Sequence, residues 1–198
     1  MLNLYHVEKC IGKGSYGQVF KVIDKNTNSI YAMKKIDLHH TSHYEKVNLI
    51  NELRILATHK CPFIVKFKKA FVETSFLYLI TEYASRGDLA SIIKTKLKIN
   101  AHFNENIIWT YFLQTCIALS YLHNLKIIHR DLKPANIFID ENDNVKLGDF
   151  GIVKLMRSFM MYGQTQIGTP LYMGPEIYKR ERYDAKADIW SLGCVLYE

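Results

Sequence analysis

The sequence predicts an α+β fold of two lobes, because the pattern of apolar residues changes along the chain. Residues 1–83 hold short apolar runs separated by glycines or polar turns, which is typical of β-strands. From residue 84 onward, the longer segments repeat their apolar residues with a helical period. We therefore expect a first lobe of five strands and one helix at about 1–83, and a mostly helical second lobe at about 84–198.

The strands of the first lobe are bounded by turn-forming residues. The five expected strands lie at 5–11, 18–24, 30–36, 65–71 and 76–83. The helix is expected at about 44–57, because Leu49, Leu53 and Leu56 recur at i, i+4 and i+7. Glu52 lies beside this apolar stripe. It is either an edge residue whose carboxylate reaches water or the partner of a cation across the stripe.

The second lobe is expected to begin with a short helix that Asp88 caps. A long helix is predicted at about 104–123 from its apolar face, and two short strands at 137–140 and 145–147. The final segment, 185–198, has a helical pattern and is apolar nearly all round. Such a helix is expected to need burial on every side.

Composition limits the classes of function. Apolar residues make up 48% and charged residues 23%, the mix of a globular rather than a disordered protein. Lys plus Arg number 26 against 19 Asp plus Glu, and the net charge of +7 favours an anionic partner without identifying it. The four cysteines form no CxxC pair, which argues against a zinc knuckle or a disulfide framework and fits a reducing compartment. With no apolar run near the roughly 18 residues of a membrane span and no secretory signal, a soluble intracellular chain is expected.

A glycine-rich motif lies between the first two expected strands. Gly12, Gly14, Gly17 and Val19 have the spacing G-x-G-x-x-G-x-V. Glycines at this spacing let backbone N–H groups approach phosphate oxygens, although a glycine-rich hairpin is often only a hairpin. Since a strand rather than a helix follows the last glycine, the motif favours a flap over nucleotide phosphates rather than a dinucleotide-binding fingerprint.

Lys34 lies near the end of the third expected strand, and by itself it reads as a surface lysine beside Lys35. Lys34 and Glu52 are, however, the cation and the carboxylate that an ion pair between this strand and the helix requires. Such a pair would hold the lysine toward the α- and β-phosphates of a nucleotide.

The strongest motif consists of two adjacent runs. They are His129-Arg130-Asp131-Leu132-Lys133-Pro134-Ala135-Asn136 and Gly148-Asp149-Phe150-Gly151. With the glycine motif, these runs make residues 5–198 look like a eukaryotic protein kinase. The position of Lys133, two residues after Asp131, resembles the serine/threonine class. Further segments are similar to NIMA-related kinases, namely 82–91, 135–139, 146–151 and 168–173.

The resemblance implies an ATP-dependent serine/threonine protein kinase with a five-stranded antiparallel sheet in its N-lobe and a mostly helical C-lobe. It implies that Asp131 accepts or orients the proton of the substrate hydroxyl and that Lys133 neutralises the transferring phosphoryl group. Asn136 and Asp149 are expected to hold Mg2+, which prefers oxygen ligands.

The resemblance also implies a nucleotide site. The residues expected to contact ATP are Ile11, Gly12, Gly14, Gly17, Val19, Ala32, Lys34, Thr81, Glu82, Ala84, Asp88 and Phe138. Val19 and Ala32 on one side and Phe138 on the other are expected to enclose the adenine. The backbone of residues 82–84 is expected to bind the adenine edge. Thr81 is expected to leave a back pocket open.

Residues 149–176 resemble an activation loop. Thr165 matches the regulatory phosphorylation site of the resembled branch, and Arg130 is the expected partner of the added phosphate. Thr169 is expected to bridge the catalytic aspartate and lysine. Gly174 departs from the usual Ala or Ser before Pro-Glu, and it is expected to loosen the end of the loop.

The cluster of His39, His40 and His43 is not a feature of the resembled family. Three histidines suit zinc, but no Cys or carboxylate follows at helical spacing. A solvated loop is therefore the better interpretation.

Two other classes of function fit part of the pattern. A truncated, inactive kinase-like binding module or scaffold is the alternative to an enzyme, although every charged catalytic position is filled. A nucleic-acid binder has little support, because the lysines are scattered and no nucleic-acid motif accompanies them.

The resemblance implies partners that are protein substrates with Ser or Thr, with cytoskeletal or ciliary proteins as candidates, and neither nucleic acid nor membrane. The implied location is cytoplasmic, with the nucleus or the cytoskeleton as alternatives. Against the resembled pattern, the chain stops inside the helix expected at 185–198. We therefore expect a C-lobe without its last helices, an uncovered apolar helix face, and poor stability and weak activity.

Overall fold

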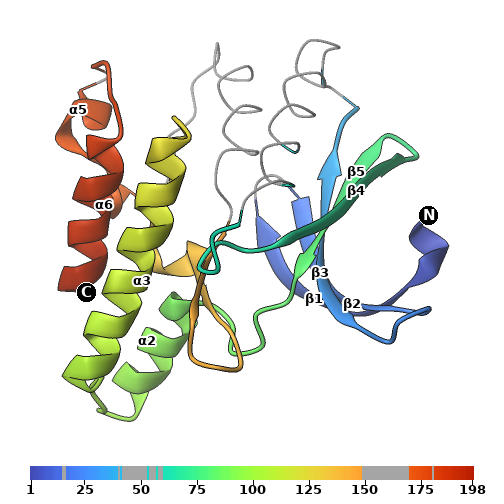
Figure 1. Cartoon of the computed structure of the whole chain (residues 1–198), viewed down its shortest axis with the longest axis horizontal. Coiled ribbons are helices and arrows are strands. Elements are labelled where there is room, and N and C mark those ends of the chain that lie inside the picture. The colour runs from blue at the N-terminus through green and yellow to red at the C-terminus, as the bar shows by residue number, and fades with distance from the viewer. Residues whose placement is uncertain are drawn as a thin grey trace. The chain divides into compact units, whose positions relative to one another are not determined.

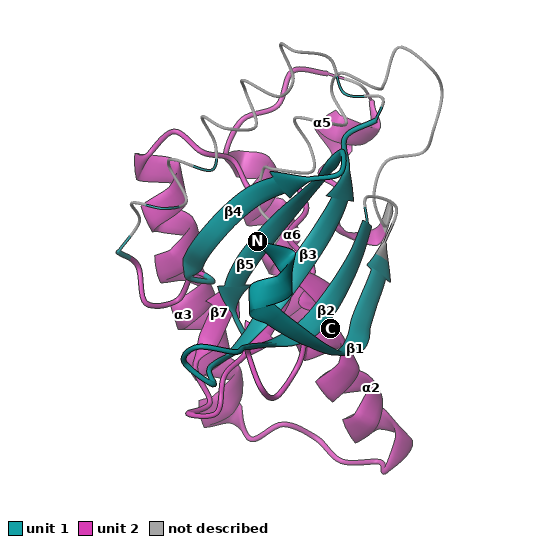
Figure 2. Ribbon diagram, turned by 90° about the vertical axis from the view of Figure 1, so that its right-hand side faces the viewer, with its two compact units in different colours: residues 1–60, 65–83 teal, residues 61–64, 84–198 magenta. Residues whose placement is uncertain are grey.

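The computed structural model describes residues 1–14, 17–39, 41, 53, 57, 60–148, 170–179 and 181–198. The chain divides into two compact units, which Figure 2 colours separately. Unit 1 consists of residues 1–60 and 65–83, and unit 2 of residues 61–64 and 84–198. The short segment 61–64 joins unit 2 because its backbone pairs with a strand there, through the Phe63 carbonyl and the Leu147 N–H at 2.8 Å.

Unit 1 is built on one antiparallel sheet. Its strands are β1 (Tyr5–Gly14), β2 (Gly17–Asp24), β3 (Ile30–Asp37), β4 (Phe67–Glu73) and β5 (Phe76–Glu82). They are ordered β1-β2-β3-β5-β4 (Figure 1). The predicted five-stranded antiparallel sheet is confirmed. The strand ends differ by a few residues from the predicted ones, because hydrogen bonds to the neighbouring strand set them and the apolar pattern does not report these bonds.

The helix expected at 44–57 lies outside the described residues, apart from Leu53 and Ala57, which are both helical. A short 3-10 turn at Leu2–Leu4 precedes β1 and was not predicted. Its residue Leu2 donates its backbone N–H to the Glu73 carboxylate at the end of β4, at 2.9 Å. The start of the described chain is thereby joined to the edge strand of the sheet.

One face of the sheet carries the apolar core of unit 1. Its buried residues are Tyr5, Val22, Met33, Phe71, Tyr78 and Ile80. The ring of Phe71 stacks on Tyr78 with centroids 5.2 Å apart, and on Tyr5 at 6.4 Å. These residues come from all five strands, so this face holds the sheet together.

Unit 2 is mostly helical, as predicted. Its helices are α2 (Leu89–Lys98), α3 (Glu105–Asn124), α5 (Pro175–Tyr178) and α6 (Lys186–Tyr197), and its small sheet consists of β6 (Ile137–Ile139) and β7 (Val145–Leu147). The predicted cap of α2 is confirmed, since the Asp88 carboxylate accepts from the Ser91 N–H at 2.8 Å. The long helix α3 lies beside α6 (Figure 1).

The core of unit 2 joins the helices to the small sheet. Its most deeply buried aliphatic residues are Leu119, Leu122, Leu132, Ile137, Ile139, Val145 and Leu147. The expected uncovered apolar face of α6 is observed among the described residues. Ala187 and Leu192 are buried, but Ile189 and Trp190 are about half exposed at 55% and 51%. The described part of the chain packs against one side of α6, where α3 and the turn Pro170–Tyr172 lie.

Among the described residues, no helix is both long enough and apolar enough to cross a membrane.

Candidate functional site

The sheet of unit 1 gathers the predicted nucleotide-binding side chains on the face opposite its core. Val19 lies directly opposite Lys34 in the register, and Ala32 lies opposite Thr81. Residues paired in this way share a face of the sheet. Because Ala32 and Lys34 are two residues apart on β3, all four side chains belong to one face. Met33 lies between them and belongs to the core on the other face.

Two glycines of the glycine-rich hairpin, Gly17 and Gly12, differ in whether the fold requires a glycine. Gly17 has φ 146°, and a Cβ there would lie 1.9 Å from the Lys35 carbonyl oxygen, so the fold itself requires a glycine. A Cβ on Gly12 would meet only the Val19 side chain, at 3.7 Å, which is an ordinary contact. The fold of the hairpin therefore does not require a glycine at position 12.

The other residues predicted for this part of the site are only partly described. Ile11 is 41% exposed on β1. Glu52, the predicted partner of Lys34, lies outside the described residues. The Glu82 carboxylate accepts a hydrogen bond from the Lys66 N–H at 2.7 Å, a contact within unit 1. Ala84 is the first residue of the second segment of unit 2.

The predicted catalytic side chains of unit 2 converge on Asp131. Lys133 Nζ donates to Asp131 Oδ2 at 3.1 Å. Asn136 Nδ2 donates to the same Oδ2 at 3.1 Å and to the Asp131 carbonyl oxygen at 2.7 Å. Asn136 is buried, whereas the side chains of Asp131 and Lys133 are about a quarter exposed, at 26% and 23%. The structure thus brings together three residues predicted from one motif, around a carboxylate that is partly exposed to solvent.

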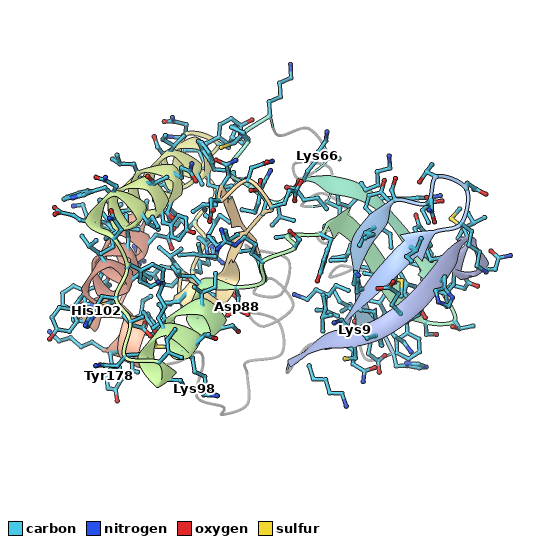
Figure 3. The ribbon with its side chains drawn as sticks, turned by 90° about the horizontal axis from the view of Figure 1, so that it is seen from below. Lys9, Lys66, Asp88, Lys98, His102 and Tyr178 are labelled. Atoms are coloured by element: carbon cyan, nitrogen blue, oxygen red, sulfur yellow. The ribbon has the colours of Figure 1, made fainter. Side chains whose placement is uncertain are left out.

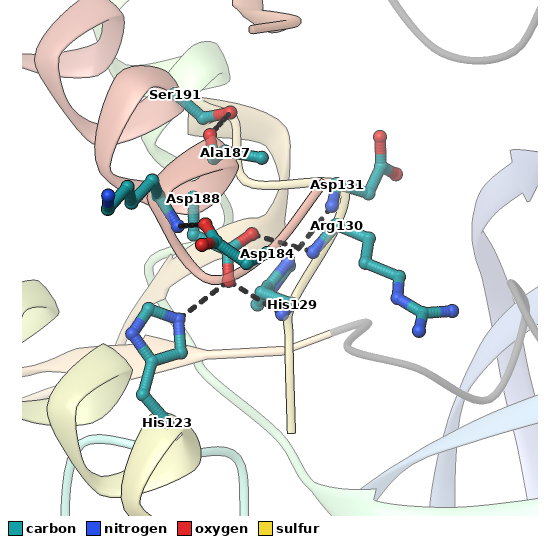
Figure 4. A network of polar contacts seen from close by, with 9 residues as sticks. His123, His129, Arg130, Asp131, Asp184, Ala187, Asp188 and Ser191 are labelled. Atoms are coloured by element: carbon teal, nitrogen blue, oxygen red, sulfur yellow. Dashed lines mark hydrogen bonds and ion pairs between the residues drawn. The ribbon is translucent and has the colours of Figure 1, made fainter. Parts of the chain in front are cut away.

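A buried carboxylate from α6 holds the backbone of this loop (Figure 4). Asp188 is 1% exposed, and its two oxygens accept the backbone N–H groups of His129 and Arg130, each at 2.8 Å. His123 at the end of α3 approaches the same carboxylate, with Nε2 at 2.8 Å from Oδ2. Three contacts from two other segments satisfy a group that would otherwise be costly to bury.

His129 is fully buried and ties the loop to the end of β7. The Asp131 N–H donates to His129 Nδ1 at 3.3 Å, so His129 Nε2 carries the proton and donates to the Gly148 carbonyl at 3.1 Å. Arg130 has φ 67°, a conformation that non-glycine residues rarely adopt. The hydrogen bonds on either side of Arg130 hold the loop in this strained turn.

Asp88 and Phe138, predicted for ribose and adenine, are neighbours in unit 2. Their backbones form an isolated antiparallel bridge. Both oxygens of the Asp88 carboxylate already accept from Ser91, through its N–H and its hydroxyl, each at 2.8 Å. Asp88 lies at the start of α2 and Lys98 at its other end (Figure 3). In the structure Asp88 therefore caps a helix, and its contact with ribose stays a prediction.

The donor set for a metal is described only in part. Asn136 uses its amide nitrogen for Asp131, and its amide oxygen is the atom that suits Mg2+. Asp149 lies outside the described residues. Within the described ranges, no group of three or more His, Cys, Asp or Glu side chains could hold a metal ion. The oxygen donors on this loop are of the kind that Mg2+ prefers.

The predicted regulatory threonines, Thr165 and Thr169, lie outside the described residues. The Arg130 guanidinium lies 5.6 Å from the centre of the Tyr183 ring. At Gly174, a Cβ would lie 2.6 Å from Glu176 Oε1, so this glycine lets the Glu176 carboxylate fold against the backbone.

The histidine cluster is described only at His39. Its Nδ1 contacts the Asp37 carboxylate at 2.6 Å, and its side chain is about half exposed. This geometry agrees with a solvated loop at His39, while His40 and His43 lie outside the described residues.

Two residues of this site were not predicted from the sequence. Asp188 was placed only as part of a helical run, and His123 only as the end of a helix. The available signal was a carboxylate within an otherwise apolar helix, because an acidic residue on a buried face needs partners.

Comparison with known proteins agrees with this geometry. The family model described as "Protein kinase domain" matches residues 5–198. Serine/threonine-protein kinase Nek3 of Mus musculus is 41% identical over 199 residues, which cover 98% of this chain and 37% of that protein. Serine/threonine-protein kinase Nek2 of Homo sapiens is 38% identical, covering 98% of this chain and 45% of that protein.

A relative from a third organism gives a similar result. The probable serine/threonine-protein kinase nek2 of Dictyostelium discoideum is 39% identical over 202 residues, covering 100% of this chain and 48% of that protein. The chain spans less than half the length of these relatives. The similarity to NIMA-related kinases predicted from the sequence is confirmed.

Proposed function

This chain belongs to the protein kinase family, and from that premise we propose that it transfers the γ-phosphate of ATP to Ser and Thr hydroxyls of protein substrates. The observation that carries the proposal is the cluster of Asp131, Lys133 and Asn136. The side chains of Lys133 and Asn136 both donate to the Asp131 carboxylate, and the loop that bears all three residues is tied to the buried Asp188. Such a rigid arrangement is what phosphoryl transfer requires of a protein, since positioning and electrostatics supply most of the catalysis.

Each residue of the cluster has a proposed role. Asp131 accepts a hydrogen bond from the substrate hydroxyl, orients its oxygen and takes its proton as the new O–P bond forms. The bond between the γ-phosphorus and the bridging oxygen to the β-phosphate breaks in the same step, and ADP leaves. Asn136 fixes the rotamer of Asp131 by donating to Oδ2. Lys133 places its ammonium group 3.1 Å from that oxygen, where it balances negative charge on the phosphoryl group.

The face of the sheet that bears Val19, Ala32, Lys34 and Thr81 is proposed to bind ATP, with the Lys34 ammonium toward the phosphates. Asn136 and Asp149 are proposed to bind Mg2+, which neutralises phosphate charge when bound. Thr165 is proposed as the phosphorylation site that regulates activity. Cytoskeletal or ciliary substrates and a cytoplasmic location are proposed from the similarity to Nek kinases alone.

Asp131→Asn tests the proposed activity. The purified chain is incubated with Mg-ATP and a generic basic protein, and phosphate incorporation is measured. Loss of the proton acceptor should lower the rate by about 10²- to 10⁴-fold, while the thermal unfolding midpoint stays unchanged. Glu141→Gln, in an exposed turn, removes the same charge and should keep the wild-type rate. Equal incorporation by wild type and Asp131→Asn would overturn the proposal and favour a binding scaffold.

A further inference from the structure

The C-terminal end of α2 carries an exposed patch that the proposed catalytic site does not use. We call Lys94, Lys96, Leu97, Lys98 and Ile99 the α2 tip. Leu97 and Ile99 are 72% and 70% exposed, among the most exposed aliphatic side chains of the described residues. Lys94 and Lys98 are exposed beside them. Because Lys94, Leu97 and Lys98 are spaced i, i+3 and i+4, they lie on one side of the helix.

The third lysine is held within unit 2. Lys96 Nζ donates to the His102 carbonyl at 3.2 Å and lies 4.8 Å from the centre of the Phe103 ring. Its charge therefore stays at the base of the patch, whereas Lys94 and Lys98 extend into solvent. Lys94 and Lys98 therefore flank the exposed Leu97 on one side of α2, and the exposed Ile99 follows as the C-terminal cap residue.

The sequence stretch that forms the α2 tip carries charge of one sign. No acidic residue occurs between Asp88 and Glu105 in the sequence. Asp88 lies at the opposite end of α2, where its carboxylate caps the helix (Figure 3). Lysines in a last helical turn stabilise the helix dipole, and this accounts for Lys96 and Lys98. It does not account for two aliphatic side chains held in water next to them.

We propose that the α2 tip is a docking surface for an acidic peptide segment that carries an apolar side chain, within a protein partner. Charge complementarity identifies the acidic class, because the exposed lysines attract carboxylates and fix their register. Leu97 and Ile99 supply the apolar contact, and water released from them adds to the affinity.

A peptide fits this surface better than an anionic membrane does. Helices that lie in a membrane interface present a long apolar face, commonly with aromatic residues. The α2 tip offers two aliphatic side chains over little more than one turn, and its neighbour Phe103 is engaged with Lys96. Such a small area suits one side chain of a peptide rather than insertion into lipid.

Binding at the α2 tip does not depend on phosphate transfer. Only the further step, that the bound partner is also phosphorylated, rests on the proposed kinase activity. In that case docking would raise the local concentration of a substrate near the enzyme.

A random twelve-residue peptide display library tests the surface. Selection on the wild-type chain should enrich peptides with several Asp or Glu around an aliphatic or aromatic residue. For a synthetic peptide of the enriched sequence, K94E/K98E and L97S/I99S should each weaken binding by about tenfold or more. K66E/K68E makes the same charge change at exposed lysines of unit 1 and should bind as wild type does.

The possible outcomes separate the alternatives. Enrichment without acidic residues, or equal binding by wild type and K94E/K98E, overturns the proposal. Sedimentation of wild type but not K94E/K98E with phosphatidylserine vesicles, without peptide enrichment, would assign the patch to membranes instead. The same preparations are assayed with Mg-ATP and the generic substrate, so that failed docking and failed catalysis are read separately.

Discussion

The two units of the chain position their functional side chains in different ways. In unit 1, alternation along each strand and the register between strands together place Val19, Ala32 and Lys34 on one face. In unit 2, the loop around Asp131 depends on Asp188, which lies 58 residues beyond Arg130 in the chain. The first arrangement is distributed over many backbone hydrogen bonds between strands, whereas the second depends on one buried carboxylate.

This difference has a consequence for tolerance to mutation. A sheet face is shared by many residues, so replacing one side chain leaves the others in place. A buried carboxylate that satisfies two backbone N–H groups has no substitute, and its removal affects every residue of the loop. The two units should therefore respond very differently to a single change.

The largest effect is expected for Asp188→Ala. It leaves the buried N–H groups of His129 and Arg130 without their acceptor, at a cost of about 2–5 kcal/mol in the free energy of unfolding. The loop that bears Asp131 should also shift, which lowers phosphate transfer on the order of 10²-fold. Denaturant titration and the Mg-ATP assay measure the two quantities.

Asp188→Asn keeps the size of the side chain and one acceptor oxygen, so it should fold better than Asp188→Ala and still lose activity. Glu181→Gln, seven residues earlier on an exposed loop, also removes one carboxylate charge and is the control, which should change neither quantity appreciably. Wild-type activity in both Asp188 variants would contradict the anchoring role.

A smaller effect is expected for Gly17→Ala in the hairpin of unit 1. A Cβ at φ 146° would lie 1.9 Å from the Lys35 carbonyl oxygen, so the backbone of β2 or β3 must move. We expect a loss of about 1–3 kcal/mol in stability. Gly12→Ala, on the same hairpin, makes only an ordinary contact with Val19 and should keep its stability. Equal unfolding midpoints for the two variants would show that Gly17 is not sterically required.

The smallest effect is expected for Glu73→Gln at the end of β4. The Leu2 N–H, followed by the terminal ammonium group, lowers the pKa of the Glu73 carboxyl below its ordinary 4.5. The ionised Glu73 carboxylate therefore stabilises the folded chain fully above about pH 4.5. This stabilisation is lost as the pH falls through the lowered pKa that Glu73 has in the folded chain. Wild type should melt slightly higher than Glu73→Gln at pH 7, and the two melting curves should converge in acid. If the difference in melting temperature between wild type and Glu73→Gln grew as the pH falls, the lowered pKa of Glu73 would be contradicted.

Much of the fold followed from the sequence because its signals are local. The five strands, the cap at Asp88 and the helices of unit 2 were each predicted from a pattern within a few residues. The grouping of Asp131, Lys133 and Asn136 was also predictable, since they belong to one short motif. The predicted ends of the strands were less accurate, because the true ends depend on pairing between strands.

The site was predicted less completely where distant residues meet. The sequence pattern marked 185–198 as helical but did not reveal that Asp188 binds the backbone of residues 129 and 130. It also did not reveal that both carboxylate oxygens of Asp88 accept from Ser91. Both facts depend on which groups come within hydrogen-bonding distance after folding.

The sequence by itself determined the class of fold, the family and the chemical types of the proposed catalytic residues. Periodicity and short motifs act over a few residues, and folding does not change the order of residues along the chain. Only the tertiary structure decided which buried polar groups are paired and which glycine is sterically required. Those outcomes depend on packing between segments far apart in the chain, as between Asp188 and the loop that carries Asp131.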